Sequence, residues 1–153
     1  MRFLGGNPST GERGDLSVAV SEGRPVGWSV DFGDVDCDGF SDLLVGTGSV
    51  VEVFRGRAAG IGTSAVSVLR TDGAPRPLGW ATATVDVDGD GCTDALVSGS
   101  QEAGSFPFVG GEGAVYVFLG APGSVGLRPT PSYHVRDPEG EEMREWLFAN
   151  RIR

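Results

Sequence analysis

The sequence lacks most of the features that mark enzymes, membrane proteins and nucleic-acid-binding proteins. It contains a single histidine, His134, and no HExxH, GxSxG or GxxxxGK(S/T) motif. No apolar stretch approaches the roughly 18 residues of a membrane span, and the N-terminus has no basic segment followed by a long apolar core, as an export signal would. Basic residues do not gather in a patch, which argues against nucleic acid as a partner. We therefore expect a non-enzymatic protein with no membrane span.

Glycine and aspartate are abundant instead. Glycine contributes 26 of the 153 residues, while charged residues make up 22% and aromatic residues 8%, a composition typical of turn-rich β proteins. The net charge is −9, from 12 basic and 21 acidic residues. Eight of the acids lie in two short stretches, and the 13 others nearly balance the 12 basic residues. The acidity is thus concentrated where a cation could bind.

The two acidic stretches, residues 34–42 and 86–94, share the pattern DxDxDGxxD. Calcium takes roughly six to eight oxygen ligands, and such a loop offers side chains at positions 1, 3 and 5, a backbone carbonyl at position 7 and a carboxylate further on. Glycine at position 6 permits the sharp turn, and magnesium fits less well because it keeps several of its waters. The predicted ligands of two calcium ions are Asp34, Asp36, Asp38, the carbonyl of Phe40 and Asp42 in the first loop, and Asp86, Asp88, Asp90, the carbonyl of Cys92 and Asp94 in the second.

A helix-loop-helix calcium site opens with the same spacing, but it needs a bidentate Glu at position 12. Position 12 is Val45 in one copy and Val97 in the other, which excludes that motif. The residues after each loop form a short apolar run bounded by glycine, and this predicts a buried strand. A metal-free acidic turn is the remaining alternative, and the second copy in matching flanks disfavours it.

An internal repeat surrounds the two loops. Gly27-Trp28-Ser29-Val30 matches Gly79-Trp80-Ala81-Thr82 at the offset of 52 that also relates the loops, and residues 51–56 match residues 115–120 at an offset of 64. The second repeat therefore contains 12 extra residues, which we place within residues 101–113 as an extended loop. We expect the second half of a preceding unit at 1–26, repeats at 27–78 and 79–136, and a tail or short helix at 137–153.

The succession of Gly-Trp-Ser-Val, the acidic loop, Leu43-Leu44-Val45-Gly46 and Val53-Phe54-Arg55-Gly56 resembles the FG-GAP repeat of the integrin alpha-chain propeller and its bacterial relatives. Residues 79–120 resemble it a second time. The resemblance implies an all-β chain of β-propeller blades in a seven-bladed family, with calcium between the first two strands of a blade. The sequence departs from the family in having Trp28 and Trp80 in place of Phe and a degenerate Gly-Ala-Pro segment. Two full four-stranded blades plus half of a preceding one do not close a ring, so we expect part of a larger or self-completing propeller.

The resemblance also implies function. It favours a non-enzymatic, calcium-binding segment that acts in adhesion or in protein or glycan recognition, outside the cell or on its surface, with calcium as the structural staple of each blade. The alternative is an accessory propeller part of a larger secreted enzyme of the polysaccharide lyase or phospholipase type, and a purely structural spacer is a third hypothesis. The expected partners are a protein or glycan ligand and further blades or other copies of the chain.

The only two cysteines occupy different positions in the two loops. Cys37 is at position 4 of the first, and Cys92 is at position 7 of the second. A disulfide needs Cα atoms within about 7 Å of each other, which is hard to arrange between two loops that each fold around their own ion. We therefore expect free thiols, or cysteine side chains tucked under the loops, and no disulfide.

Overall fold

The computed structural model describes residues 2–6, 13–17, 27–71, 77–100, 113–123, 127 and 131–136. All regular structure within these ranges is β-strand, as the sequence predicts. No helix that could span a membrane is found among the same residues. The expected insertion, except its last residue, and the expected tail at 137–153 lie outside the described residues.

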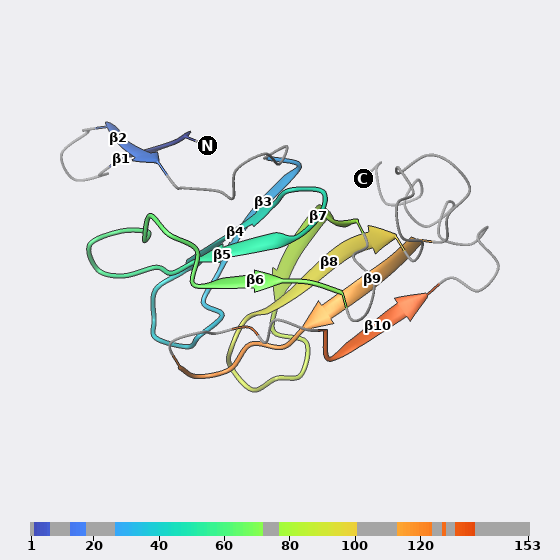
Figure 1. Cartoon of the computed structure of the whole chain (residues 1–153). Coiled ribbons are helices and arrows are strands. Elements are labelled where there is room, and N and C mark those ends of the chain that lie inside the picture. The colour runs from blue at the N-terminus through green and yellow to red at the C-terminus, as the bar shows by residue number, and fades with distance from the viewer. Residues whose placement is uncertain are drawn as a thin grey trace, which may run out of the picture.

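The strands form two antiparallel sheets of four and a separate hairpin (Figure 1). In each four-stranded sheet the strands are neighbours in chain order, so each sheet is a simple meander. The first sheet contains β3 (Ser29–Gly33), β4 (Asp42–Gly46), β5 (Val51–Phe54) and β6 (Ser67–Leu69); the second contains β7 (Leu78–Val85), β8 (Asp94–Ser100), β9 (Gly113–Phe118) and β10 (Tyr133–Arg136); the hairpin pairs β1 (Arg2–Gly6) with β2 (Arg13–Ser17). The all-β fold with blade-like sheets is confirmed, and the described sheets do not close into a ring.

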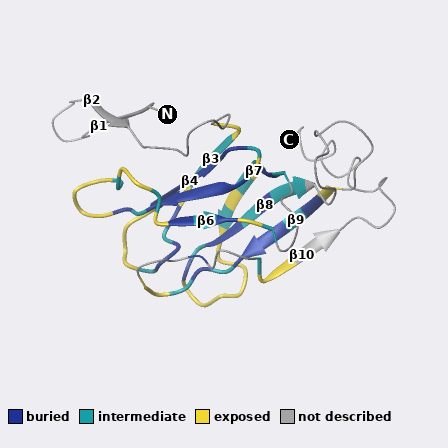
Figure 2. Ribbon diagram, viewed as in Figure 1, coloured by how far each residue is buried: buried dark blue, intermediate teal, exposed yellow. Residues whose placement is uncertain are grey.

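The two central strands of the first sheet, β4 and β5, are mostly apolar, and every one of their residues is buried, including Asp42 and Glu52. Side chains alternate between the faces of a strand, so Leu44 of β4 and Val53 of β5 contribute to the main core. Leu43, Val45 and Phe54 form a second, smaller cluster. Figure 2 shows the buried residues, in dark blue, along β4.

The main core lies between the two sheets. Its buried residues come from both of them and from the segments beside them: Val35, Leu44, Val51, Val53, Leu69, Leu78, Ala95, Val97, Ala114, Tyr116, Phe118 and Leu127. Strand β7, at one edge of the second sheet, also contacts β3 and β4 of the first sheet directly. The two repeats are therefore packed as neighbouring layers that share one core.

This packing has a consequence for the acidic loops. Residues 34–41 join β3 to β4, and residues 86–93 join β7 to β8. Because β3 and β7 contact each other and each loop follows the corresponding strand, both loops lie at the same edge of the molecule. The Thr93 N–H donates to the carbonyl oxygen of Asp34 at 2.9 Å, which joins one loop to the other directly.

Candidate metal centre

The first acidic loop is wound around the carboxylate of its first residue. Asp34 accepts hydrogen bonds from the N–H groups of Asp38, at 3.0 Å, and Gly39, at 2.9 Å. The N–H of Phe40 donates to Asp38 at 3.0 Å. Gly39 has a φ of 90°, a left-handed conformation that glycine adopts without strain, which explains the glycine at position 6.

The second loop repeats this winding with its own residues. Asp86 accepts from the N–H groups of Gly89, at 2.7 Å, and Gly91, at 3.0 Å. Gly91 has the same φ of 90° as Gly39. The N–H of Cys92 donates to Asp90 at 2.8 Å, as Phe40 does to Asp38 in the first loop. Two loops of the same sequence pattern thus adopt similar local structures. They differ in one donor, because the first carboxylate accepts from position 5 in the first loop and from position 4 in the second.

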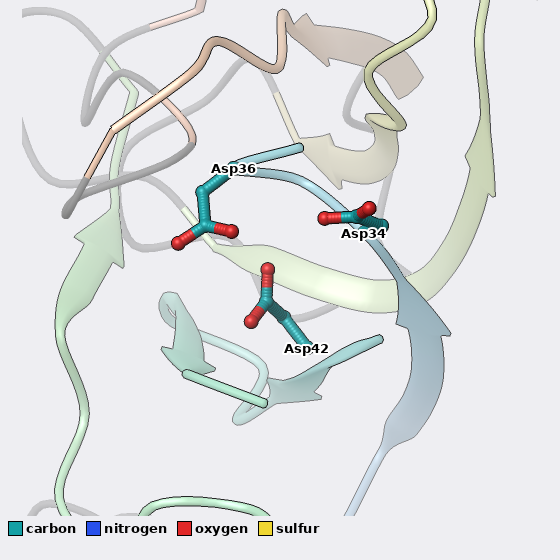
Figure 3. Close-up of side chains that lie close together, drawn as sticks. All are labelled: Asp34, Asp36 and Asp42. Atoms are coloured by element: carbon teal, nitrogen blue, oxygen red, sulfur yellow. The ribbon is translucent and has the colours of Figure 1, made fainter. Parts of the chain in front are cut away.

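Three carboxylates converge in each loop. Oxygen atoms of Asp34, Asp36 and Asp42 lie within 4.8 Å of one another, and Figure 3 shows the three side chains pointing toward a common space. Asp86, Asp88 and Asp94 form the matching group in the second loop. Either group could hold a metal ion.

Four of the ten predicted ligands lie outside these two groups. Asp38 and Asp90 accept the local N–H bonds described above. Phe40 is 42% exposed, and Cys92 is buried. The predicted ligand roles of the Phe40 and Cys92 carbonyls remain predictions.

The last aspartate of each loop has a second role that the sequence pattern does not reveal. Asp42 accepts from the N–H groups of Val35, at 3.1 Å, and Gly56, at 2.7 Å. Asp94 accepts from Val87, at 2.7 Å, and Gly120, at 2.8 Å. Both aspartates are buried. Each therefore connects the start of its loop to the segment that directly follows the third strand of its sheet. The available signal was that Gly56 and Gly120 end the two matching stretches, residues 51–56 and 115–120.

The electrostatics of the first group favour a cation. Burial raises the pKa of Asp36 above its ordinary value, and the nearby Arg55 guanidinium opposes this shift. Burial also raises the pKa of Asp42, against the opposing effect of the hydrogen bonds from Gly56 and Val35. Asp36 is only 3% exposed, and its Oδ1 atom is buried with no hydrogen-bond partner. A buried carboxylate oxygen without a donor is unfavourable on its own, so the donor set fits a hard cation that this oxygen would coordinate.

Comparison with known families agrees with the repeat seen in the sequence. A model of the FG-GAP repeat matches residues 78–118, and a model of an FG-GAP-like repeat matches residues 34–97. The chain belongs to the FG-GAP repeat family. The two matches together cover residues 34–118, which include both acidic loops of the FG-GAP units and most of their strands. A search of curated proteins found no match to the chain.

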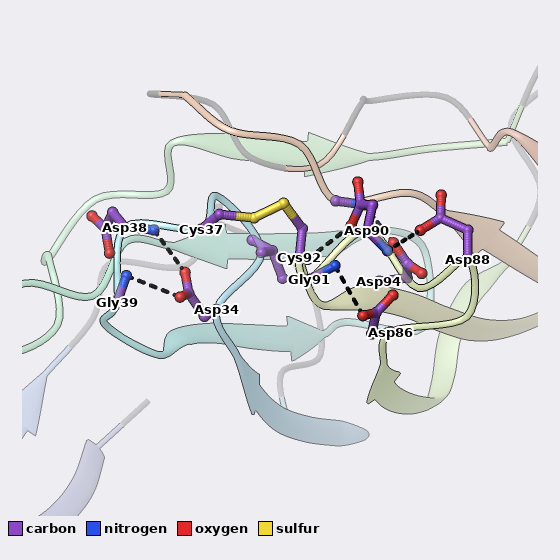
Figure 4. The surroundings of a disulfide bond; sticks show 12 residues. Asp34, Cys37, Asp38, Gly39, Asp86, Asp88, Asp90, Gly91, Cys92 and Asp94 are labelled. Carbon is purple, nitrogen blue, oxygen red and sulfur yellow. Dashed lines mark hydrogen bonds between the residues drawn. A yellow bond between two sulfur atoms is a disulfide. The ribbon is translucent and has the colours of Figure 1, made fainter.

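The expectation of free thiols was wrong. Cys37 and Cys92 form a disulfide that joins the loop of the first FG-GAP repeat to the loop of the second, with Cα atoms 5.1 Å apart (Figure 4). The prediction treated the loops as separate bodies. The packing of β3 on β7 places them side by side instead, and it brings position 4 of one loop to position 7 of the other.

A basic residue that the ligand pattern does not include also lies at the first FG-GAP loop. Nη2 of Arg55, one residue after β5, makes ion pairs with Asp36 Oδ2 and, at 3.2 Å, with Asp38 Oδ2. The first carboxylate group therefore has a resident positive charge beside it. The sequence signal was the arginine in Val-Phe-Arg-Gly, which the second repeat replaces with leucine.

Proposed function

We propose that each acidic loop binds one calcium ion and that the ion holds the loop of its FG-GAP blade in place. The observation that carries the proposal is the Oδ1 atom of Asp36, which is buried, has no hydrogen-bond partner and belongs to a group of three converging carboxylates. An ion coordinated there would satisfy this oxygen and offset the repulsion between the carboxylates. The second loop has the same winding and the same group of three, which supports a second site.

The proposed ligand set is larger than the two groups of three. Calcium takes roughly six to eight oxygens, so the side chains of Asp38 and Asp90 and the carbonyls of Phe40 and Cys92 are proposed to complete the two shells. Small movements of these groups would accompany binding. The set consists of oxygens alone, and this hard donor chemistry favours calcium over zinc or copper.

We further propose that the calcium-stabilised chain acts without catalysis, as a propeller segment in adhesion or in the recognition of a protein or glycan. Family membership supports a structural, non-catalytic role. The disulfide supports an extracellular or cell-surface location, because disulfides persist in oxidising compartments. Calcium sites of extracellular modules typically have Kd values near 10⁻⁴ to 10⁻³ M and would be filled there.

The metal is tested by calorimetric titration of the purified chain with calcium alone. The wild type should bind two ions, and Asp36→Asn and Asp88→Asn should each bind one. Asp31→Asn, which removes an acid outside both loops, is the matched control and should bind two. At a hundred times Kd an ion that binds only the folded chain stabilises it by about 2.7 kcal/mol, so the melting temperature should fall clearly in chelator. No heat of binding together with no shift in melting would overturn the metal assignment.

The recognition role needs a separate experiment. Adhesion or recognition predicts that the chain is retained on a glycan or protein array in calcium and released by chelator. Retention that does not depend on calcium, or no retention, would count against it. Turnover of a polysaccharide or phospholipid by a longer protein that contains this chain would favour the alternative of an accessory part of a secreted enzyme.

A further inference from the structure

The two acidic loops differ in one charged contact. Arg55 reaches back to the first loop and makes ion pairs with Asp36 and Asp38. Among the described residues, no arginine or lysine makes an ion pair with the acids of the second loop. Two of the four carboxylates of the first loop thus have a positively charged partner, which the described residues do not provide for the second loop.

The residue equivalent to Arg55 in the second repeat is Leu119. Sequence alignment at an offset of 64 pairs these two residues. The hydrogen bonds support the alignment independently, because the next residues, Gly56 and Gly120, donate to Asp42 and Asp94 in the same way. The two positions therefore occupy the same place in their blades, and they can be exchanged by substitution.

We propose that Arg55 sets the calcium affinity of the first loop and makes it the weaker of the two sites, so that the second loop fills first. This inference rests on the proposed calcium binding. A guanidinium keeps its charge at all relevant pH values, so it repels an incoming cation and competes for the carboxylates of Asp36 and Asp38. Since the Arg55 side chain is 22% exposed and Asp36 only 3%, solvent screens this contact incompletely.

Arg55 has the opposite effect when no ion is bound. It then supplies a counter-charge to buried Asp36, whose second oxygen has no partner. Arg55 therefore partly compensates the charge of the first loop in the ion-free chain. In the second loop Asp86, Asp88 and Asp90 are exposed to solvent instead. Arg55 thus stabilises the ion-free state and weakens the ion-bound state of the same loop.

The test measures each loop separately by calorimetric titration with calcium. Asp88→Asn leaves only the first site, and Asp36→Asn leaves only the second. Adding Arg55→Leu to Asp88→Asn should tighten binding about tenfold, and adding Leu119→Arg to Asp36→Asn should weaken it about tenfold, as expected for one incompletely screened charge. Arg57→Leu in the Asp88→Asn background is the matched control. It removes the same net charge from an exposed residue two positions away, and it should leave the affinity unchanged.

A second readout separates an electrostatic role from a merely structural one. Arg55→Leu should lower the melting temperature in chelator and raise the gain in melting temperature on adding calcium. Arg55→Gln, which removes the charge but keeps a polar side chain, should change both melting temperatures in the same direction. It replaces Arg55→Leu if that variant does not fold.

The proposal has two ways to fail, and they are distinguishable. Unchanged or weaker calcium binding after loss of Arg55, with Asp88→Asn still binding one ion, would overturn the role of Arg55 and leave the calcium site intact. Absence of calcium binding to the wild type and to both single-site variants would overturn the proposed function, and the role of Arg55 with it.

Discussion

At the scale of single residues, the first loop places acids where charge is unfavourable without a partner. Asp36 and Asp42 both have a pKa raised above the ordinary value of 3.8, and burial is the largest cause in each case. A folded chain with raised carboxyl pKa values binds more protons than the unfolded chain as the pH passes through that range. The contribution of these two carboxyls to the stability of the ion-free chain should therefore fall as the pH rises above 3.8 and remain lower at neutral pH.

The substitution Asp36→Asn tests this residue-scale argument. Asparagine is nearly isosteric and uncharged, so in chelator at neutral pH the variant should resist urea better than the wild type. The difference should shrink as the pH falls toward 3.8, where the wild-type carboxyl also becomes neutral. With calcium present the order should reverse, because the variant lacks a ligand. Urea unfolding at a series of pH values measures both effects, and a variant that is less stable in chelator at neutral pH would contradict the argument.

At the scale of elements, the strands and the winding of the loops could be predicted from the sequence, because local patterns determine them. Apolar runs such as Leu43–Val45 become buried strands, and the spacing of acids and glycines becomes the loop. The contacts that the sequence did not reveal connect distant segments. Arg55 reaches the first loop from the end of β5, and Cys37 meets Cys92 across the two sheets. Such contacts depend on how the sheets pack, which a periodic pattern does not specify.

At the same scale, the disulfide between Cys37 and Cys92 should stabilise the folded chain. It closes a segment of chain between residues 55 positions apart, for which the chain-entropy model gives about 4 kcal/mol of stabilisation. The double variant Cys37→Ser, Cys92→Ser should lose stability of that order in urea unfolding. Reduction of the wild type with a dithiol should reproduce the loss, and the same reductant should leave the double variant unchanged. If reduction left the urea midpoint of the wild type unmoved, the disulfide would not constrain the chain as described.

At the scale of the whole molecule, the stability of the fold depends on the contact between the two sheets, which we call the seam. A repeat unit of this kind buries its faces only against its neighbours, so the seam supplies much of the stability. Ser29 donates from its hydroxyl to the carbonyl of Gly79 across the seam at 3.0 Å. The rings of Trp28 and Trp80 pack edge to face with centroids 4.4 Å apart. The tryptophans that replace the family's usual phenylalanine therefore meet each other between the two repeats.

The seam also requires the absence of a side chain at Gly46. A Cβ there would overlap the carbonyl oxygen of Gly79 and the hydroxyl of Ser29. Overpacking of this kind typically lowers stability by about 1–3 kcal/mol, so Gly46→Ala should lower the free energy of unfolding measured in urea by an amount in that range. Gly62→Ala is the matched control. A Cβ at Gly62 would have only the carbonyl oxygen of Arg55 nearby, at 3.4 Å, and its backbone is not left-handed. The control should unfold like the wild type, and equal stability of the two variants would show that the sheets do not approach each other as closely at Gly46 as described.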